Sequence, residues 1–117
     1  MIISRGQGAS PGRATGPLAL SSAAAVELGA RGTPSIYVRN EMDADDVPAI
    51  RASAGVVIAR GGITADGAIA ARALGKPCIV GCSGLVVTQG ELRSDDVRLF
   101  AGATVTIDGT TGEISRD

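Results

Sequence analysis

The chain has 117 residues, the length of one domain, and is long enough for a single hydrophobic core without a disulfide or a structural metal. Its formal net charge is −1, its Lys and Arg residues are scattered, and it has one Tyr, one Phe and no Trp. The sequence therefore lacks the basic stripe of duplex-binding proteins and the aromatic platforms on which single-stranded bases stack.

The chain has no histidine, so none of its residues can carry a phosphoryl group on an imidazole ring. No apolar run approaches the length of a membrane span, and the N-terminus lacks a signal-peptide core. We therefore expect a soluble, cytoplasmic protein that binds neither a membrane nor nucleic acid. Cys78 and Cys82 match neither a zinc-ligand set nor a C-x-x-C motif, so we expect buried, reduced thiols, no metal and no cofactor.

The first elements alternate between turns, strands and one helix. Residues 6–16, with four glycines and a proline, predict a turn-rich loop. Residues 17–20 predict a short strand, after which Ser21 or Ser22 can cap an alanine-rich helix that ends at Gly29. The β-branched and aromatic residues at 35–38 then predict a buried strand.

The acidic segment that follows has the pattern of a helix start. Asp43 is a candidate N-cap, and Asp45 and Asp46 fall in the first turn, where carboxylates suit the positive end of the helix dipole. Pro48 keeps the helix short, and Ile50 is expected to point inward. Capping accounts for this acidic cluster, so we predict no metal site here.

The second half of the chain begins with residues 56–59, a continuous apolar run typical of a strand buried on both faces. A glycine-containing loop precedes a helix predicted over residues 65–74, and further strands are predicted at 78–80, 85–88 and 104–107. Strands that alternate with short helices, with paired strands near both ends, favour a mixed α/β domain over a doubly wound sheet.

The junction between the strand at 56–59 and the next helix is a candidate anion site. Gly61 and Gly62 let the backbone turn sharply and approach a ligand. The free N–H groups and the positive dipole end at the helix start can hold a phosphate. With Arg60 and Arg72 nearby in the sequence, we predict phosphate binding by Arg60, Gly61, Gly62, Thr64 and Arg72. The same junction also occurs as a plain connection, so it indicates a type of site and no reaction.

Residues 60–81, RGGITADGAIAARALGKPCIVG, resemble the active-site segment of phosphoenolpyruvate-utilising enzymes, above all the pyruvate phosphate dikinase family, with the pattern R-G-G-x-T-S-H-A-A-x-x-A-R-x-x-G-K-P-x-x-x-G. Residues 9–12 match the start of the family's domain, and residues 78–85 and 107–113 match its end. The resemblance implies that residues 1–117 form a single mobile, swivelling domain of the phosphohistidine type, with a three-layer β/β/α fold.

In that family, the swivelling domain moves between two partners. Its histidine accepts a phosphoryl group from ATP at an ATP-grasp nucleotide-binding domain and passes it on at a phosphoenolpyruvate/pyruvate barrel. The resemblance implies the same two partners for this chain, in cis or in trans, and a family activity of phosphotransferase. In this sequence Asp66 occupies the histidine position and Ala65 the serine position.

Two neighbours of Asp66 are also informative. Thr64 matches the threonine that a regulatory protein phosphorylates in plant dikinases; without the histidine, we expect it to cap the helix. Gly67 is expected to add backbone freedom to the helix start, at a cost of about 1 kcal/mol relative to alanine.

Three roles for Asp66 follow. It complements the helix N-terminus in a non-catalytic scaffold or regulatory domain, and we expect this role, with the chain alone inactive. It carries a phosphoryl group as an aspartyl phosphate, although such sites normally use a magnesium ion with further carboxylates, which are not evident near Asp66. It belongs to a docking module for a separate nucleotide-binding partner.

Overall fold

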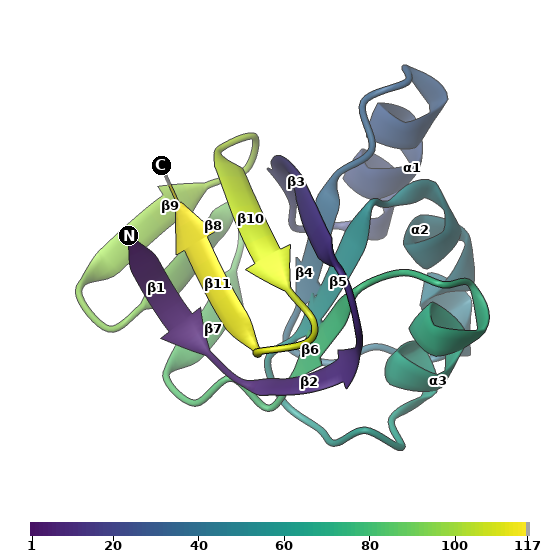
Figure 1. The fold of residues 1–117 in the computed structure, drawn as a ribbon. Helices are drawn as coiled ribbons and strands as arrows, with labels where there is room; N and C mark the ends of the chain where they lie inside the picture. Colours follow the sequence, from purple (N-terminus) through teal and green to yellow (C-terminus); the bar gives the residue numbers. More distant parts are fainter. Residues whose placement is uncertain (117) are drawn as a thin grey trace.

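The structure, a computed structural model, describes residues 1–116 as a mixed α/β domain (Figure 1). The chain forms one eight-stranded sheet, with the order β1-β11-β10-β3-β4-β5-β6-β2, and one three-stranded sheet, with the order β7-β8-β9. The strands are β1 (Ile2–Arg5), β2 (Gln7–Ser10), β3 (Arg13–Ala19), β4 (Ile36–Arg39), β5 (Gly55–Ile58), β6 (Cys78–Val80), β7 (Leu85–Thr88), β8 (Glu91–Ser94), β9 (Val97–Phe100), β10 (Thr104–Asp108) and β11 (Glu113–Arg116). The helices are α1 (Ser22–Ala30), the 3-10 turn η1 (Ala44–Asp46), α2 (Val47–Ala52) and α3 (Asp66–Ala73).

The centre of the large sheet is parallel. Strands β3, β4, β5 and β6 are neighbours in that order, and the helices that connect them lie together on one side of the sheet (Figure 1). Because these strands run in the same direction, the loops that follow β4, β5 and β6 meet at one edge. The predicted strands at 35–38, 56–59 and 78–80 are confirmed as β4, β5 and β6.

The rest of the large sheet is antiparallel. The first part of β3 pairs with β10, while its last two residues pair with β4. Strand β1 pairs with β11 and strand β2 with β6, so these two consecutive strands form the opposite edges of the sheet. Since only Gly6 separates β1 from β2, the sheet must curl to bring its edges together.

The predicted loop at residues 6–16 is wrong, because this segment contains β2 and the first half of β3. Two of its glycines allow close crossings of the backbone. A Cβ atom on Gly8 would lie 2.1 Å from the carbonyl oxygen of Gly109, and one on Gly16 would lie 2.6 Å from that of Pro34. Only Gly12, with φ of +114°, lies at a turn between the strands.

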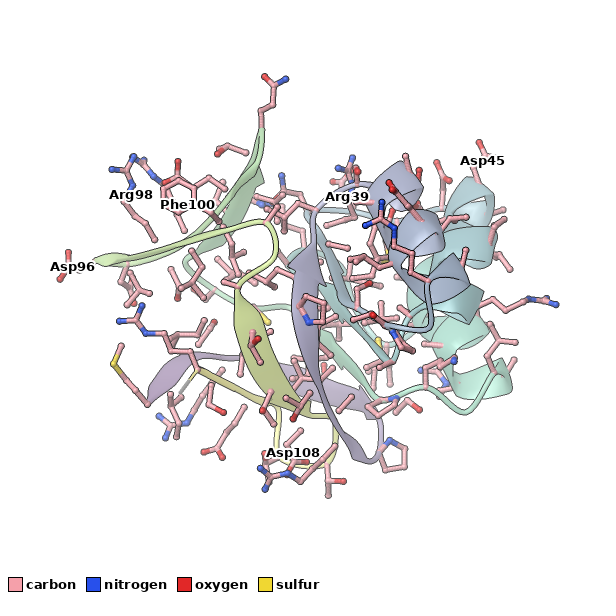
Figure 2. The ribbon with its side chains drawn as sticks, turned by 90° about the horizontal axis from the view of Figure 1, so that it is seen from above. Arg39, Asp45, Asp96, Arg98, Phe100 and Asp108 are labelled. Carbon is pink, nitrogen blue, oxygen red and sulfur yellow. The ribbon has the colours of Figure 1, made fainter. Side chains whose placement is uncertain are left out.

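The small sheet is a meander that packs one face against the large sheet. Its inner face belongs to the first core cluster, which includes Leu85, Leu92 and Leu99. Its outer face carries Phe100, which is 62% exposed, and Arg98, which donates to Glu91 at 2.6 Å. Figure 2 shows Arg98 and Phe100 together on this sheet, far from Asp45 on the helical side.

Two apolar clusters hold the three layers together. The first lies between the two sheets and the second between the large sheet and the helices, so the expected β/β/α arrangement is confirmed. The second cluster contains Ala25, Ala49, Ala68 and Ala71, whose small side chains let the helices approach the sheet closely.

The ends of α1 differ in part from the expectation. Ser21 is the N-cap and its hydroxyl accepts from the amide of Ala24 at 3.2 Å, as predicted. Gly29 lies inside the helix, and a Cβ there would come within 2.7 Å of the Ala52 carbonyl oxygen on α2. The residue that leaves the helix in a left-handed conformation is Gly32, with φ of +79°. Among residues 1–116 there is no helix with the length and apolar character needed to span a membrane.

Candidate functional site

The loop after β5 begins with two hydrogen bonds to the segment at the end of β4. The amides of Ala59 and Arg60 donate to the carbonyl groups of Arg39 and Asn40, each at 2.9 Å. The chain after β5 therefore stays hydrogen-bonded, for two residues, to the end of β4 and the residue that follows it. These hydrogen bonds place Arg60 at the edge where the parallel strands end.

The backbone then turns into α3 through the two predicted glycines. Gly61 has φ of +103°, a conformation that favours glycine, and the carbonyl of Gly62 accepts from the amide of Ala65 at 3.0 Å. Ala65 is the N-cap, and no side-chain hydrogen bond caps the helix. The helix-capping role expected for Thr64 is therefore wrong, because the helix begins too far along the chain for Thr64 to be its N-cap.

Asp66 is the first residue of α3 and is exposed. Its carboxylate makes no capping hydrogen bond, so its favourable interaction with the helix is with the dipole alone. Ile63 and Ile69, three residues before and after it, are 43% and 49% exposed. The start of α3 thus combines a carboxylate with apolar side chains open to solvent.

Gly67 is required by packing. A Cβ atom at this position would lie 2.9 Å from the Cδ1 atom of Ile58 and 2.9 Å from the Cβ atom of Met42. From the sequence, we expected only that the backbone freedom of Gly67 would destabilise the start of the helix. The structure adds the compensating contact, because the missing side chain lets the first turn of α3 lie directly against β5.

The two arginines predicted to bind phosphate lie near opposite ends of α3. Arg60 precedes the helix, and its guanidinium donates weakly to the side-chain oxygen of Asn40, at 3.4 Å. Arg72 lies in the last turn, six residues after Asp66 and roughly 9 Å further along the axis. It donates to the carbonyl of Ala9 on β2 at 3.2 Å. The structure therefore brings Arg60, Gly61, Gly62 and Thr64 together and separates Arg72 from them.

A second loop, which the sequence analysis did not assign to the site, lies beside the first. Residues 81–85 and 59–61 line a depression of about 420 Å³ at the carboxyl ends of β5 and β6. The pairing of Ile58 with Val80 brings these loops together. The sequence signal that could have revealed the second loop is the glycine pair Gly81 and Gly84, which follows a buried strand as Gly61 does.

Both cysteines are free and buried, as expected. Burial raises the pKa of Cys78 to about 12 and that of Cys82 to about 11. Since the thiolate is the reactive form, these thiols are poor nucleophiles at neutral pH. Cys82 lines the depression as a neutral group.

The acidic segment is a helix cap, as predicted. The Asp43 carboxylate accepts from the amide of Asp45, and the Asp46 carboxylate accepts from the amide of Asp43, both at 2.9 Å. The other oxygen of Asp46 accepts from the hydroxyl of Tyr37 at 2.5 Å. Within residues 1–116, no group of three or more Cys, Asp or Glu side chains is arranged to hold a metal ion.

Comparison with known proteins gives one family. The family described as "PEP-utilising enzyme, mobile domain" matches residues 32–112. The chain is similar to "Pyruvate, phosphate dikinase 2" of Oryza sativa subsp. japonica, with 40% identity over 116 residues, 97% of this chain and 13% of the rice protein. It is also similar to "Pyruvate, phosphate dikinase" of Rhizobium meliloti (strain 1021), with 38% identity over 115 residues, again 97% of this chain and 13% of the relative. The chain thus spans a small fraction of the length of these relatives.

Proposed function

Because the chain belongs to the family of the PEP-utilising enzyme mobile domain, we propose that residues 1–117 form one swivelling domain of a dikinase-like protein and serve as its non-catalytic scaffold or regulatory unit. The observation that carries this proposal is the residue at the start of α3. The chain has no histidine, and Asp66 stands where the resemblance to the family puts the phosphoryl-accepting histidine.

The partners in this proposal are an ATP-grasp nucleotide-binding domain and a phosphoenolpyruvate/pyruvate barrel, in cis or in trans. The exposed start of α3 supports a docking role. Ile63 and Ile69 offer apolar area to a partner, and Asp66 lies between them in the sequence. We propose that the domain acts in the cytoplasm and binds neither a membrane nor nucleic acid.

The alternative in which Asp66 carries the phosphoryl group has one observation in its favour. Its carboxylate is exposed at the positive end of α3, where the dipole would stabilise an added phosphate. The oxygen of the carboxylate would attack the phosphorus atom, and the leaving group would depart with its oxygen. Since residues 1–116 offer no cluster of carboxylates for a cation, a magnesium ion for this step would have to come with the partner.

Phosphoryl labelling separates the two functions. The domain is incubated with β-labelled ATP, and separately with labelled phosphoenolpyruvate, in a lysate of its source organism, beside a histidine-bearing relative as positive control. We expect label on the relative and none on this domain. Label that hydroxylamine releases, and that Asp66→Asn abolishes, would establish the aspartyl phosphate and overturn the scaffold role.

A further inference from the structure

We propose that the two loops at the carboxyl ends of β5 and β6, residues 60–61 and 81–85, form a binding site for a phosphoryl dianion. The site would take inorganic phosphate or the terminal group of a phosphate monoester. This inference goes beyond the proposed function, since it requires neither a phosphoryl-transfer step nor Asp66.

The two loops are in contact with each other. A Cβ atom on Gly81 would lie 3.5 Å from the carbonyl oxygen of Gly61, so nothing separates the two backbones at this point. Between them and residues up to 85 lies the depression of about 420 Å³, which is ample for a tetrahedral oxyanion. In open α/β sheets, ligands bind outside the carboxyl ends of the parallel strands, which is where this depression lies.

The second loop has backbone amides without a hydrogen-bond partner beside the depression. Gly81 and Gly84 have φ of +63° and +82°, so the backbone turns sharply at both ends of this short loop. The amide of Gly81 donates to Ile58 and that of Leu85 to Cys82. The hydrogen bonds formed among residues 1–116 leave the amides of the three residues at 82–84 without an acceptor.

Charge favours an anion in this depression. Arg60 is the only charged residue among those that line it, and its one hydrogen bond to Asn40 leaves most of its N–H donors free. Asp66 does not line the depression, so its carboxylate does not contact a ligand bound there. The carboxylate oxygen Oδ1 of Asp95 lies 3.1 Å from where a Cβ atom on Gly84 would be, so a negative charge borders the site on that side without lining it.

The larger groove of the domain has the opposite character. It has a volume of about 870 Å³ and lies between the start of α1 and the β7–β8 turn. Arg39 is its one lining cation, and Figure 2 shows this residue between α1 and the small sheet. Three carboxylates, from Glu41, Asp43 and Asp46, share the groove with it. An anion is therefore better placed in the smaller depression than in the groove.

The test is a titration of the ¹⁵N-labelled 117-residue chain with inorganic phosphate, methyl phosphate and acetate at about pH 8, where phosphate is a dianion. We expect saturable shifts of the amide resonances of Gly61, Cys82, Ser83 and Gly84 with both phosphates, and weaker binding of acetate. Shifts confined to the amides at the start of α3 would overturn the proposal. Shifts that rise linearly with ligand concentration at amides throughout the chain would also overturn it.

Variants fix the location of the site. Arg60→Gln should raise the Kd for phosphate roughly ten-fold, the effect of one charge-assisted hydrogen bond. Arg72→Gln is the matched control, because it removes the same charge at the far end of α3, and it should leave the Kd within about two-fold. An equal loss in both variants would show binding by net charge alone and would overturn the site.

Two further variants separate this site from the helix start and from the proposed function. Ser83→Asp places a negative charge at the exposed lining residue and should abolish the saturable shifts. Asp66→Asn should leave the Kd within about two-fold, as expected for Arg72→Gln, whereas a phosphate bound at the start of α3 would bind several-fold more tightly once that carboxylate is neutral. Since labelling of Asp66 decides the proposed function and this titration does not depend on it, either can fail without the other.

Discussion

Gly67 on α3 lies so close to Met42 that a Cβ atom at position 67 would be 2.9 Å from Met42 Cβ and 3.2 Å from its sulfur. Both residues are buried against the large sheet. The first turn of the helix, and with it Asp66, is therefore held at a fixed distance from β5. The identity of residue 67 sets this distance.

We expect Gly67→Ala to destabilise the domain by about 1–3 kcal/mol, because overpacking at Met42 outweighs the gain in helix propensity of about 1 kcal/mol. Urea unfolding measures the difference. The control is Ala73→Gly at the exposed end of the same helix, which reports propensity alone and should cost at most about 1 kcal/mol. A more stable Gly67→Ala variant would show that the helix start is not fixed by this contact.

The cap formed by Asp43 gives a second expectation. Asp43→Ala removes the acceptor of the Asp45 amide and one half of the capping box, and should cost about 0.5–2 kcal/mol. Asp45→Ala removes an equal charge from an exposed neighbour and should cost no more than about 0.5 kcal/mol. If thermal unfolding shows an equal loss of stability in the two variants, the charge at the helix start stabilises the protein and the cap does not.

Tyr37 makes stability depend on pH in the alkaline range. Burial, followed by the hydrogen bond to Asp46, raises its pKa above the ordinary value. The folded protein therefore keeps the phenol proton that the unfolded chain loses near pH 10. The stability that Tyr37 contributes is complete below about pH 10 and is lost as the pH rises through the raised pKa of the folded state.

The variant Tyr37→Phe isolates this contribution. At about pH 8 it should be less stable than the parent by about 1–2 kcal/mol, because the substitution removes the hydroxyl that donates to Asp46. The difference between the two proteins, measured by urea unfolding, should shrink as the pH is raised above about 10. A constant difference at every pH would contradict the role given to the buried phenol.

Asn40 joins the large sheet to the small one. Its side-chain nitrogen donates to the carbonyl of Val87 and its side-chain oxygen accepts from the amide of Val87, both at 2.8 Å. Asn40→Ala should cost about 1–3 kcal/mol, because it leaves both backbone groups of the buried Val87 unpaired.

Amide hydrogen exchange shows whether this loss is local. In Asn40→Ala, exchange at Val87 should become faster than exchange at Val57 in the large sheet. Gln89→Ala, at an exposed residue of the following turn, should leave both rates unchanged. Unchanged exchange at Val87 in the Asn40 variant would show that other contacts hold the small sheet in place.

The sequence was most informative where contacts are local or where a strand is buried on both faces. The apolar run at 56–59 predicted β5, and the glycines after it predicted the turn into α3. The capping residues Ser21 and Asp43 were found because a cap is formed by residues two or three positions apart.

Contacts between distant segments could not be read in the same way. Strands β1 and β2 were not predicted, because their partners β11 and β6 lie far along the chain and the intervening glycines indicate turns. Position 8 has no room for a Cβ atom, because the backbone at Gly109 passes directly against it. No local sequence pattern reveals this contact. The depression beside Arg60 was missed for the same reason, since the pairing of β5 with β6 creates it.

The most direct test of the central claim restores the family's acceptor. In the double variant Ala65→Ser/Asp66→His the segment again reads T-S-H at the start of α3. Parent and variant are incubated with labelled ATP and a dikinase relative whose own histidine has been replaced by alanine, with that relative's intact mobile domain as control. We predict label on the control and on the double variant and none on the parent. Label on the parent that Asp66→Asn removes, or a double variant as silent as the parent beside a labelled control, would contradict the account of an intact mobile domain that lacks only its acceptor.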